Sequence, residues 1–256
     1  MLRFVPALAL LTLSGCEFFE KAGETLDGLT NPLVGLGLVL GVEEPEEADL
    51  DGTGFEAGTT FSLFLADAAN VTDLDNAPVN GAVVSLQDVQ ADDSQDGLYL
   101  ISPDVGPTYV DGASWTVDIQ LGSDVATASL TLPEAPEFAP DLIHTAETAL
   151  TLDLSGQGYE GVIIVVMESS TGDLTYTTEP QTAREVYDLT RGNTEVTEVE
   201  IPGTAFPSED ELYLVGIAGL NHANGSDVDG MNTALSSVSA GKMVFEPVST
   251  ATTPIE

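Results

Sequence analysis

The feature that most constrains the fold is a two-residue alternation of apolar and polar side chains over residues 115–132. Because successive side chains of a strand point to opposite faces of a sheet, this alternation predicts two neighbouring strands, each with one buried and one solvated face. The residues expected to face inward are Trp115, Val117, Ile119, Leu121, Ala126, Ala128, Leu130 and Leu132.

Shorter alternating runs at 61–65, 82–86 and 98–100 follow one another with turn pairs between them, Asn80-Gly81 and Asp96-Gly97. Short strands with regular turn signals predict an antiparallel β-sandwich over residues 49–132. The order of the 78–86, 96–100 and Trp115 segments resembles the immunoglobulin-like or transthyretin-like modules of bacterial surface proteins.

A second domain is expected over residues 141–247, after the proline-rich linker 133–140. Residues 201–207 and 213–218 resemble the E-to-F corner of a fibronectin type III domain, although this segment lacks tryptophan. The resemblance implies that the hydroxyl of Tyr213 bonds to backbone a few residues upstream. Residues 248–256 are expected to be a disordered tail. The expected strands are 149–154, 161–168, 174–178, 185–189, 196–201, 212–219 and 238–245.

The first 15 residues have the pattern of a signal peptide, with Arg3 before a ten-residue apolar run that is too short to cross a bilayer. Leu13-Ser14-Gly15-Cys16 resembles a bacterial lipobox, which implies cleavage between Gly15 and Cys16 and acylation of Cys16, the chain's single cysteine. Two or three acyl chains such as palmitate anchor a protein stably. Glu17 after the cysteine favours the outer membrane.

Residues 16–48 are expected to form a tether between the anchor and the first domain. In residues 17–31 the apolar side chains lie on one helical face, which predicts a short amphipathic helix. Residues 33–42 alternate glycine with leucine or valine, which indicates an extended segment. A strand packed on the first domain is the favoured interpretation, and a strip that docks a partner is the alternative.

The charge is strongly acidic, with 43 Asp and Glu against 5 Lys and Arg and a net charge of −38 at pH 7. Such a field repels nucleic acid and anionic lipid. A single cysteine excludes an intramolecular disulfide, so apolar packing must hold the fold.

No standard catalytic motif is present. His144 and His222 are far apart in the sequence, and His222 is expected in a polar loop, residues 221–225. Fragments around Asp49 and Asp51, and around Asp227 and Asp229, resemble the beginnings of calcium loops. Each is better interpreted as a turn, so no cofactor is expected, with calcium at these aspartates as the alternative.

These observations predict an all-β protein with two tandem antiparallel β-sandwich, immunoglobulin-like domains after a lipoprotein signal peptide and a short helical tether. The expected function is non-catalytic: an outer-membrane lipoprotein of the cell envelope, periplasmic or surface-exposed, that serves adhesion, ligand binding or envelope assembly. Its partners would be the membrane, through the lipid, and a protein or glycan, but no nucleic acid. One alternative is an envelope hydrolase with a site near His222, and another is a structural subunit that docks through residues 33–42.

Overall fold

The computed structural model describes residues 31–44, 50, 55–67, 77–139, 143–180, 183–190 and 195–251. Strands dominate these ranges, with one short helix, α2 (Ala183–Leu189), and two 3₁₀ turns, η3 (Gly203–Ala205) and η4 (Gly225–Asp227). The all-β prediction is therefore confirmed. No helix in the described part of the chain is long and apolar enough to cross a membrane. The predicted signal peptide, Cys16, the 17–30 segment, Asp49 and Asp51 lie outside the described residues.

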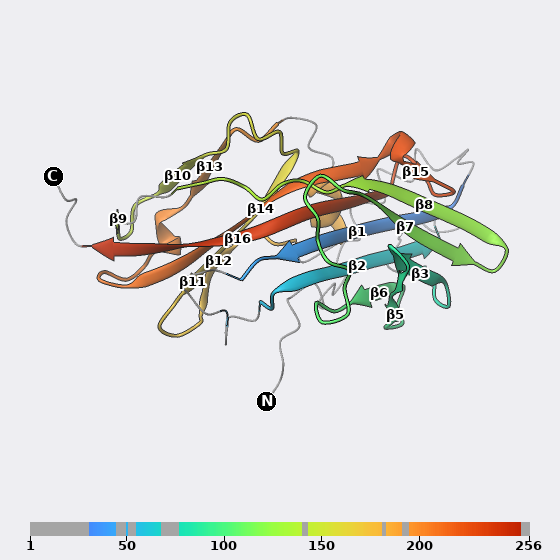
Figure 1. Cartoon of the computed structure of the whole chain (residues 1–256), viewed down its shortest axis with the longest axis horizontal. Coiled ribbons are helices and arrows are strands. Elements are labelled where there is room, and N and C mark those ends of the chain that lie inside the picture. The colour runs from blue at the N-terminus through green and yellow to red at the C-terminus, as the bar shows by residue number, and fades with distance from the viewer. Residues whose placement is uncertain are drawn as a thin grey trace.

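One long sheet forms the base of the molecule (Figure 1). Its longest strand, β16, runs along most of the molecule and pairs with β14 on one side and with β1 and β9 on the other. The sheet order is β12 (Leu174–Thr177), β11 (Gly161–Glu168), β14 (Leu212–Asn224), β16 (Ser237–Ala251), β1 (Leu33–Val42), β2 (Gly58–Asp67), β6 (Leu98–Ile101) and β5 (Asp92–Asp93), with β9 (Ile143–Thr145) on the end of β16.

Two smaller sheets cover one face of the long sheet at its two ends, which makes both ends β-sandwiches (Figure 1). Inward side chains such as Val117 and Leu63 form the core at one end. Ile201 and Val215 belong to the core at the other end. The covering sheets are β15 (Val228–Asp229), β8 (Asp124–Thr131), β7 (Ser114–Leu121), β3 (Val83–Leu86) and β4 (Val89–Gln90) at the first end, and β10 (Leu150–Asp153) with β13 (Glu198–Ile201) at the second.

A third core lies on the opposite face of the long sheet. Its side chains come from β1, β11, β14 and β16. They pack with Leu50, with Phe55 and with Leu189, which belongs to helix α2. The alternation in β14 explains the division, because Val215 and Ile217 face the covering sheet whereas Leu214 and Ala218 face the third core.

Strands from both predicted domains share the long sheet, so the two sandwiches are joined by more than the expected linker. β16 pairs parallel with β1, and this pairing departs from a purely antiparallel arrangement. The proline-rich segment is itself fastened: the backbone carbonyl of Pro133 accepts a hydrogen bond from Tyr109 at 3.1 Å, and that of Glu134 accepts one from Tyr159 at 3.2 Å. Local alternation reports where strands lie but not which distant strands pair.

Strand β1 is the glycine–leucine segment predicted to be extended, and it is buried from Val34 to Val42. Leu38, Leu40 and Val42 enter the third core, while the glycines admit side chains of the first core on the other face. A Cβ on Gly37 would lie 2.9 Å from Leu63, and one on Gly41 would lie 2.5 Å from the ring of Tyr109. The alternative of a docking strip is wrong, because the strand has no exposed face.

Three local predictions are corrected. Residues 185–189, expected as a strand, belong to helix α2 and place the apolar Val186 and Leu189 one turn apart. The expected loop around His222 is the end of β14, since pairing with β16 continues to Asn224. The expected tail begins too early, because residues 248–251 complete β16, with Val248 and Thr250 buried.

Candidate ligand-binding site

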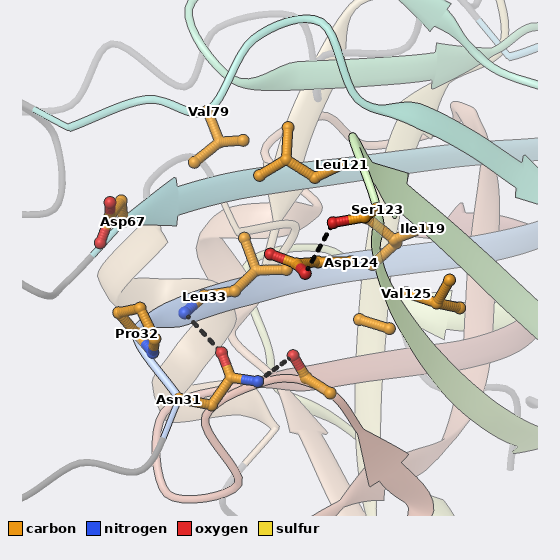
Figure 2. A pocket seen from close by; sticks show the side chains of 12 residues that line it. Asn31, Pro32, Leu33, Asp67, Val79, Ile119, Leu121, Ser123, Asp124 and Val125 are labelled. Carbon is orange, nitrogen blue, oxygen red and sulfur yellow. Dashed lines mark hydrogen bonds between the residues drawn. The ribbon is translucent and has the colours of Figure 1, made fainter.

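A cavity of about 500 Å³ opens at the end of the first sandwich, between its two sheets (Figure 2). This volume lies in the range of small-molecule sites. The lining comes from the start of β1, the end of β2, the segment before β3, the β7–β8 hairpin and the residue after β15. The lining residues are Asn31, Pro32, Leu33, Asp67, Val79, Ile119, Leu121, Ser123, Asp124, Val125, Ala126 and Gly230.

The apolar part of the cavity is continuous with the core. Val79, Ile119 and Ala126 line it and are at most 9% exposed, and all three belong to the first core cluster. Half-buried Leu33 and Leu121 pack against the same cluster. The cavity exists because the paired strands end here, at Leu33 and Asp67 in one sheet and at the turn between Leu121 and Asp124 in the other.

Polar side chains lie at the rim. The carboxylates are those of Asp67 and Asp124, both exposed, and the hydroxyl of Ser123 lies 3.4 Å from an oxygen of Asp124 (Figure 2). Among the described residues that line the cavity, no side chain is basic. The site therefore joins an apolar interior to a negatively charged entrance.

The start of β1 is held firmly beside this entrance. The side chain of Asn31 donates to the carbonyl of Gly230 and accepts from the backbone N–H of Leu33 at 3.1 Å (Figure 2). Asn232, which is 4% exposed, donates through its side chain to the carbonyl of Asn31 and through its backbone to that of Leu33. This wall of the cavity is thus set by contacts between the two ends of the described chain.

Sequence reasoning missed both rim carboxylates, because nothing in the local pattern distinguishes Asp67 or Asp124 from the other acidic residues. Of the predicted metal ligands, Asp227 and Asp229 are exposed beside the cavity residue Gly230. In the ranges that the structure describes, no three His, Cys, Asp or Glu side chains are grouped to hold a metal ion. Calcium binding stays an untested alternative.

His222 lies on the opposite face of the long sheet, beside helix α2. Its Nδ1 lies 2.8 Å from the hydroxyl of Ser239, its register partner on β16, and its backbone N–H donates to the Glu160 carboxylate at 2.8 Å. Burial lowers the pKa of His222, opposed by the charge of Glu160 and by backbone groups of Glu160 and Leu189. Ser239 is 1% exposed and Nε2 of His222 is buried, so this pair is closed to a substrate. The Nε2 of His144 lies 2.9 Å from the carbonyl oxygen of Thr148, and its ring makes an edge-on contact with Phe206.

A second cavity, of about 310 Å³, lies over the middle of the long sheet and includes Lys242 and Tyr109. The ammonium of Lys242 lies 3.0 Å from Glu43 and 3.3 Å from Asp111. Burial lowers the pKa of Lys242, but its hydrogen bonds to these two carboxylates and their charges outweigh this effect and raise it. Burial also raises the pKa of Tyr109. With its cation already paired, this cavity is a structural junction.

No model of a known protein family matches the sequence, and no curated protein is significantly similar to it. Solved structures with some likeness include domains A168–A170 from titin (7% identity, TM-score 0.22, 75% of this chain and 58% of that chain). A second is the tandem Ig repeats of Dlar (12% identity, TM-score 0.25, 83% of this chain and 100% of that chain). A third is the FN1–FN3 domains of chicken CNTN1 (11% identity, TM-score 0.22, 77% of this chain and 64% of that chain). This chain therefore spans less than two thirds of the titin and CNTN1 structures. All three TM-scores are low, and the β-sandwich assignment follows from the sheet topology and the cores between the sheets.

Proposed function

We propose that this chain is a lipid-anchored, non-catalytic binding module of the bacterial cell envelope. The lipobox Leu13-Ser14-Gly15-Cys16 supports the anchor. The observation that carries the binding role is the cavity with an apolar floor and an acidic rim at the end of the first sandwich. Its partner is a small molecule, or a protein or glycan that presents a suitable group.

The position of the cavity suits a tethered module. Asn31 lines it and is 15 residues downstream of Cys16. An extended chain of that length spans at most about 50 Å. The acylated cysteine would thus hold the cavity end of the sandwich near the lipid surface, and Glu17 favours the outer membrane as that surface.

The two other functions considered have less support. A hydrolase centred on His222 needs an exposed nucleophile, whereas the hydroxyl next to its ring belongs to the buried Ser239. A subunit that docks through residues 33–42 needs an exposed strip, and β1 has none.

The anchor is tested by expressing the full chain in a Gram-negative host with radiolabelled palmitate, and by separating inner and outer membranes on a density gradient. We expect label in the chain and sedimentation with the outer membrane. Cys16→Ala should abolish the label and release the chain from the membrane fraction, since the acceptor sulfur is gone. Ser14→Ala keeps a small residue in the lipobox and is the matched control. Unchanged membrane fractionation and labelling of the Cys16→Ala chain would refute the proposal.

A further inference from the structure

We propose that the cavity at the end of the first sandwich binds small amphiphilic cations, that is, ligands with a compact apolar body and a single ammonium group. This inference rests on the proposed function in one respect, that the cavity is a binding site. It adds the chemical class of the ligand. It follows from the order of the groups along the cavity, from its floor to its rim (Figure 2).

The floor demands an apolar body. Ile119, Val79 and Ala126 are core residues whose side chains offer no hydrogen-bonding group. Leu33 and Leu121 extend this surface toward the opening from two different sheets (Figure 2). A ligand that replaces water on these side chains gains roughly fourfold in affinity for each methylene that it buries.

The rim selects the sign of the charge. Asp67 at the end of β2 and Asp124 in the β7–β8 hairpin are the charged side chains of the described lining. An anionic head group would be repelled by these carboxylates in a protein of net charge −38, and a neutral one would gain at most a hydrogen bond to them. A ligand whose apolar body lies on the floor and whose ammonium group lies at the rim is attracted by the negative field of these carboxylates.

A bare metal ion fits this arrangement less well. The described residues supply two carboxylates at the rim, and no group of three metal-binding side chains occurs among them. A metal ion would also leave the apolar floor without a partner. The combination of an apolar wall and a charged entrance therefore favours an organic cation.

The experiment is a titration of the full chain, made by cell-free synthesis without membranes so that no acyl group is added, with n-hexylammonium chloride, followed by NMR of backbone amides. We expect shifts confined to the amides around residues 33, 79, 119 and 124–126. n-Butylammonium should bind more weakly, by up to about fourfold for each methylene removed. n-Hexanol and n-heptanoate, which have the same six-carbon apolar body, should bind more weakly than hexylammonium.

Variants separate the contribution of the rim from that of the floor. Asp67→Asn combined with Asp124→Asn should weaken hexylammonium binding by roughly three- to tenfold and leave hexanol unaffected, because exposed ion pairs contribute modestly. Asp118→Asn combined with Glu200→Gln removes an equal charge from exposed positions of β7 and β13 and is the control. Hexylammonium binding should also weaken as NaCl rises from about 20 mM to about 500 mM.

The inference is overturned if hexylammonium causes no shifts at these residues, or if hexanol and heptanoate bind as tightly as hexylammonium. It is also overturned if the variant without the two rim carboxylates binds hexylammonium as well as the control with Asp118→Asn and Glu200→Gln does. These outcomes do not depend on acylation. A chain that binds hexylammonium but takes up no palmitate would refute the envelope anchor and support the ligand class. A chain that takes up palmitate but does not bind hexylammonium would refute the ligand class and support the anchor.

Discussion

The ammonium of Lys242 on β16 lies 3.0 Å from the carboxylate of Glu43, the residue that follows β1. The same ammonium reaches Asp111, in the segment between β6 and β7, at 3.3 Å. One of five basic residues in the chain thus joins the parallel pair β1–β16 to the layer that covers it.

Replacing Lys242 by Met should destabilise the fold, because it leaves two carboxylates facing each other beside an apolar side chain. For a half-buried pair we expect a loss of roughly 1–2 kcal/mol in the free energy of unfolding at low salt. The loss should shrink at about 1 M NaCl, where the Debye length falls to about 3 Å. Urea unfolding at both salt concentrations measures this. Lys242→Arg should stay close to wild type, and a Met variant whose loss is the same at both salts would contradict the electrostatic explanation.

The shared sheet predicts that both sandwiches unfold together. β14 and β16 contribute side chains to both end cores, so neither core can open without disrupting strands of the other. Fluorescence of Trp115, which lies in the first core, should report the same urea midpoint as far-UV circular dichroism of the whole chain. Val199→Ala, a change in the second core, should move both midpoints equally. Two separate transitions would show instead that the ends fold independently.

The hydroxyl of Tyr213 makes the kind of backbone hydrogen bond that the resemblance to an E-to-F corner implies. It is fully buried, and its hydroxyl accepts a hydrogen bond from the backbone N–H of Ser208 at 2.9 Å. Tyr213→Phe should lower the free energy of unfolding by about 1–3 kcal/mol, since it leaves a backbone donor without a partner. Thermal or urea unfolding measures the loss. The same change at half-buried Tyr176 on β12 is the control, and an equal effect at the two sites would argue against the corner bond.

His222 predicts a pH dependence of stability. Its pKa is lowered from the ordinary 6.5 in the folded chain. The unfolded chain therefore binds more protons than the folded chain between that lowered pKa and 6.5, and the free energy of unfolding rises with pH across this interval. In His222→Gln the rise should be smaller, whereas His144→Gln should keep it. Melting temperatures from pH 5 to pH 8 measure the slope, and an unchanged slope in His222→Gln would refute the assignment.

Glu179 acts in the opposite direction and must be separated from His222. Burial raises its pKa from 4.5 to about 7, so the folded chain holds a proton that the unfolded chain has lost over that interval. Its contribution therefore makes stability fall as pH rises from 4.5 to about 7. The His222 comparison is for this reason best made in a Glu179→Gln background, in which the rise with pH should be steeper.

Local sequence reasoning worked best where one face of a strand is buried and the other is solvated. The alternation from Trp115 to Leu132 became β7 and β8 with the expected residues inside, and the hydroxyl of Tyr213 makes the predicted kind of backbone bond. It failed where a polar segment continues a strand. His222 lies in β14 because β16 continues beside it, and that extension is not visible in residues 221–225 themselves.

The candidate site was not predictable in this way. Asp67 and Asp124 are two acidic residues among 43, and they meet at one cavity only because β2 and the β7–β8 hairpin end at the same edge of the sandwich. The wall beside them depends on Asn31 and Asn232, which are about 200 residues apart.

The sequence by itself determined the acidic charge, the all-β fold class and the places of most strands. The fold class and the strands could be predicted because side-chain periodicity and turn residues act over a few residues. Tertiary structure decided that the glycine–leucine segment is a central strand, that one long sheet serves two sandwiches and that an apolar cavity carries an acidic rim. These features depend on pairing and burial between distant segments. The free energy of burying shared apolar surface selects such pairings, and this free energy cannot be read from the local residue pattern.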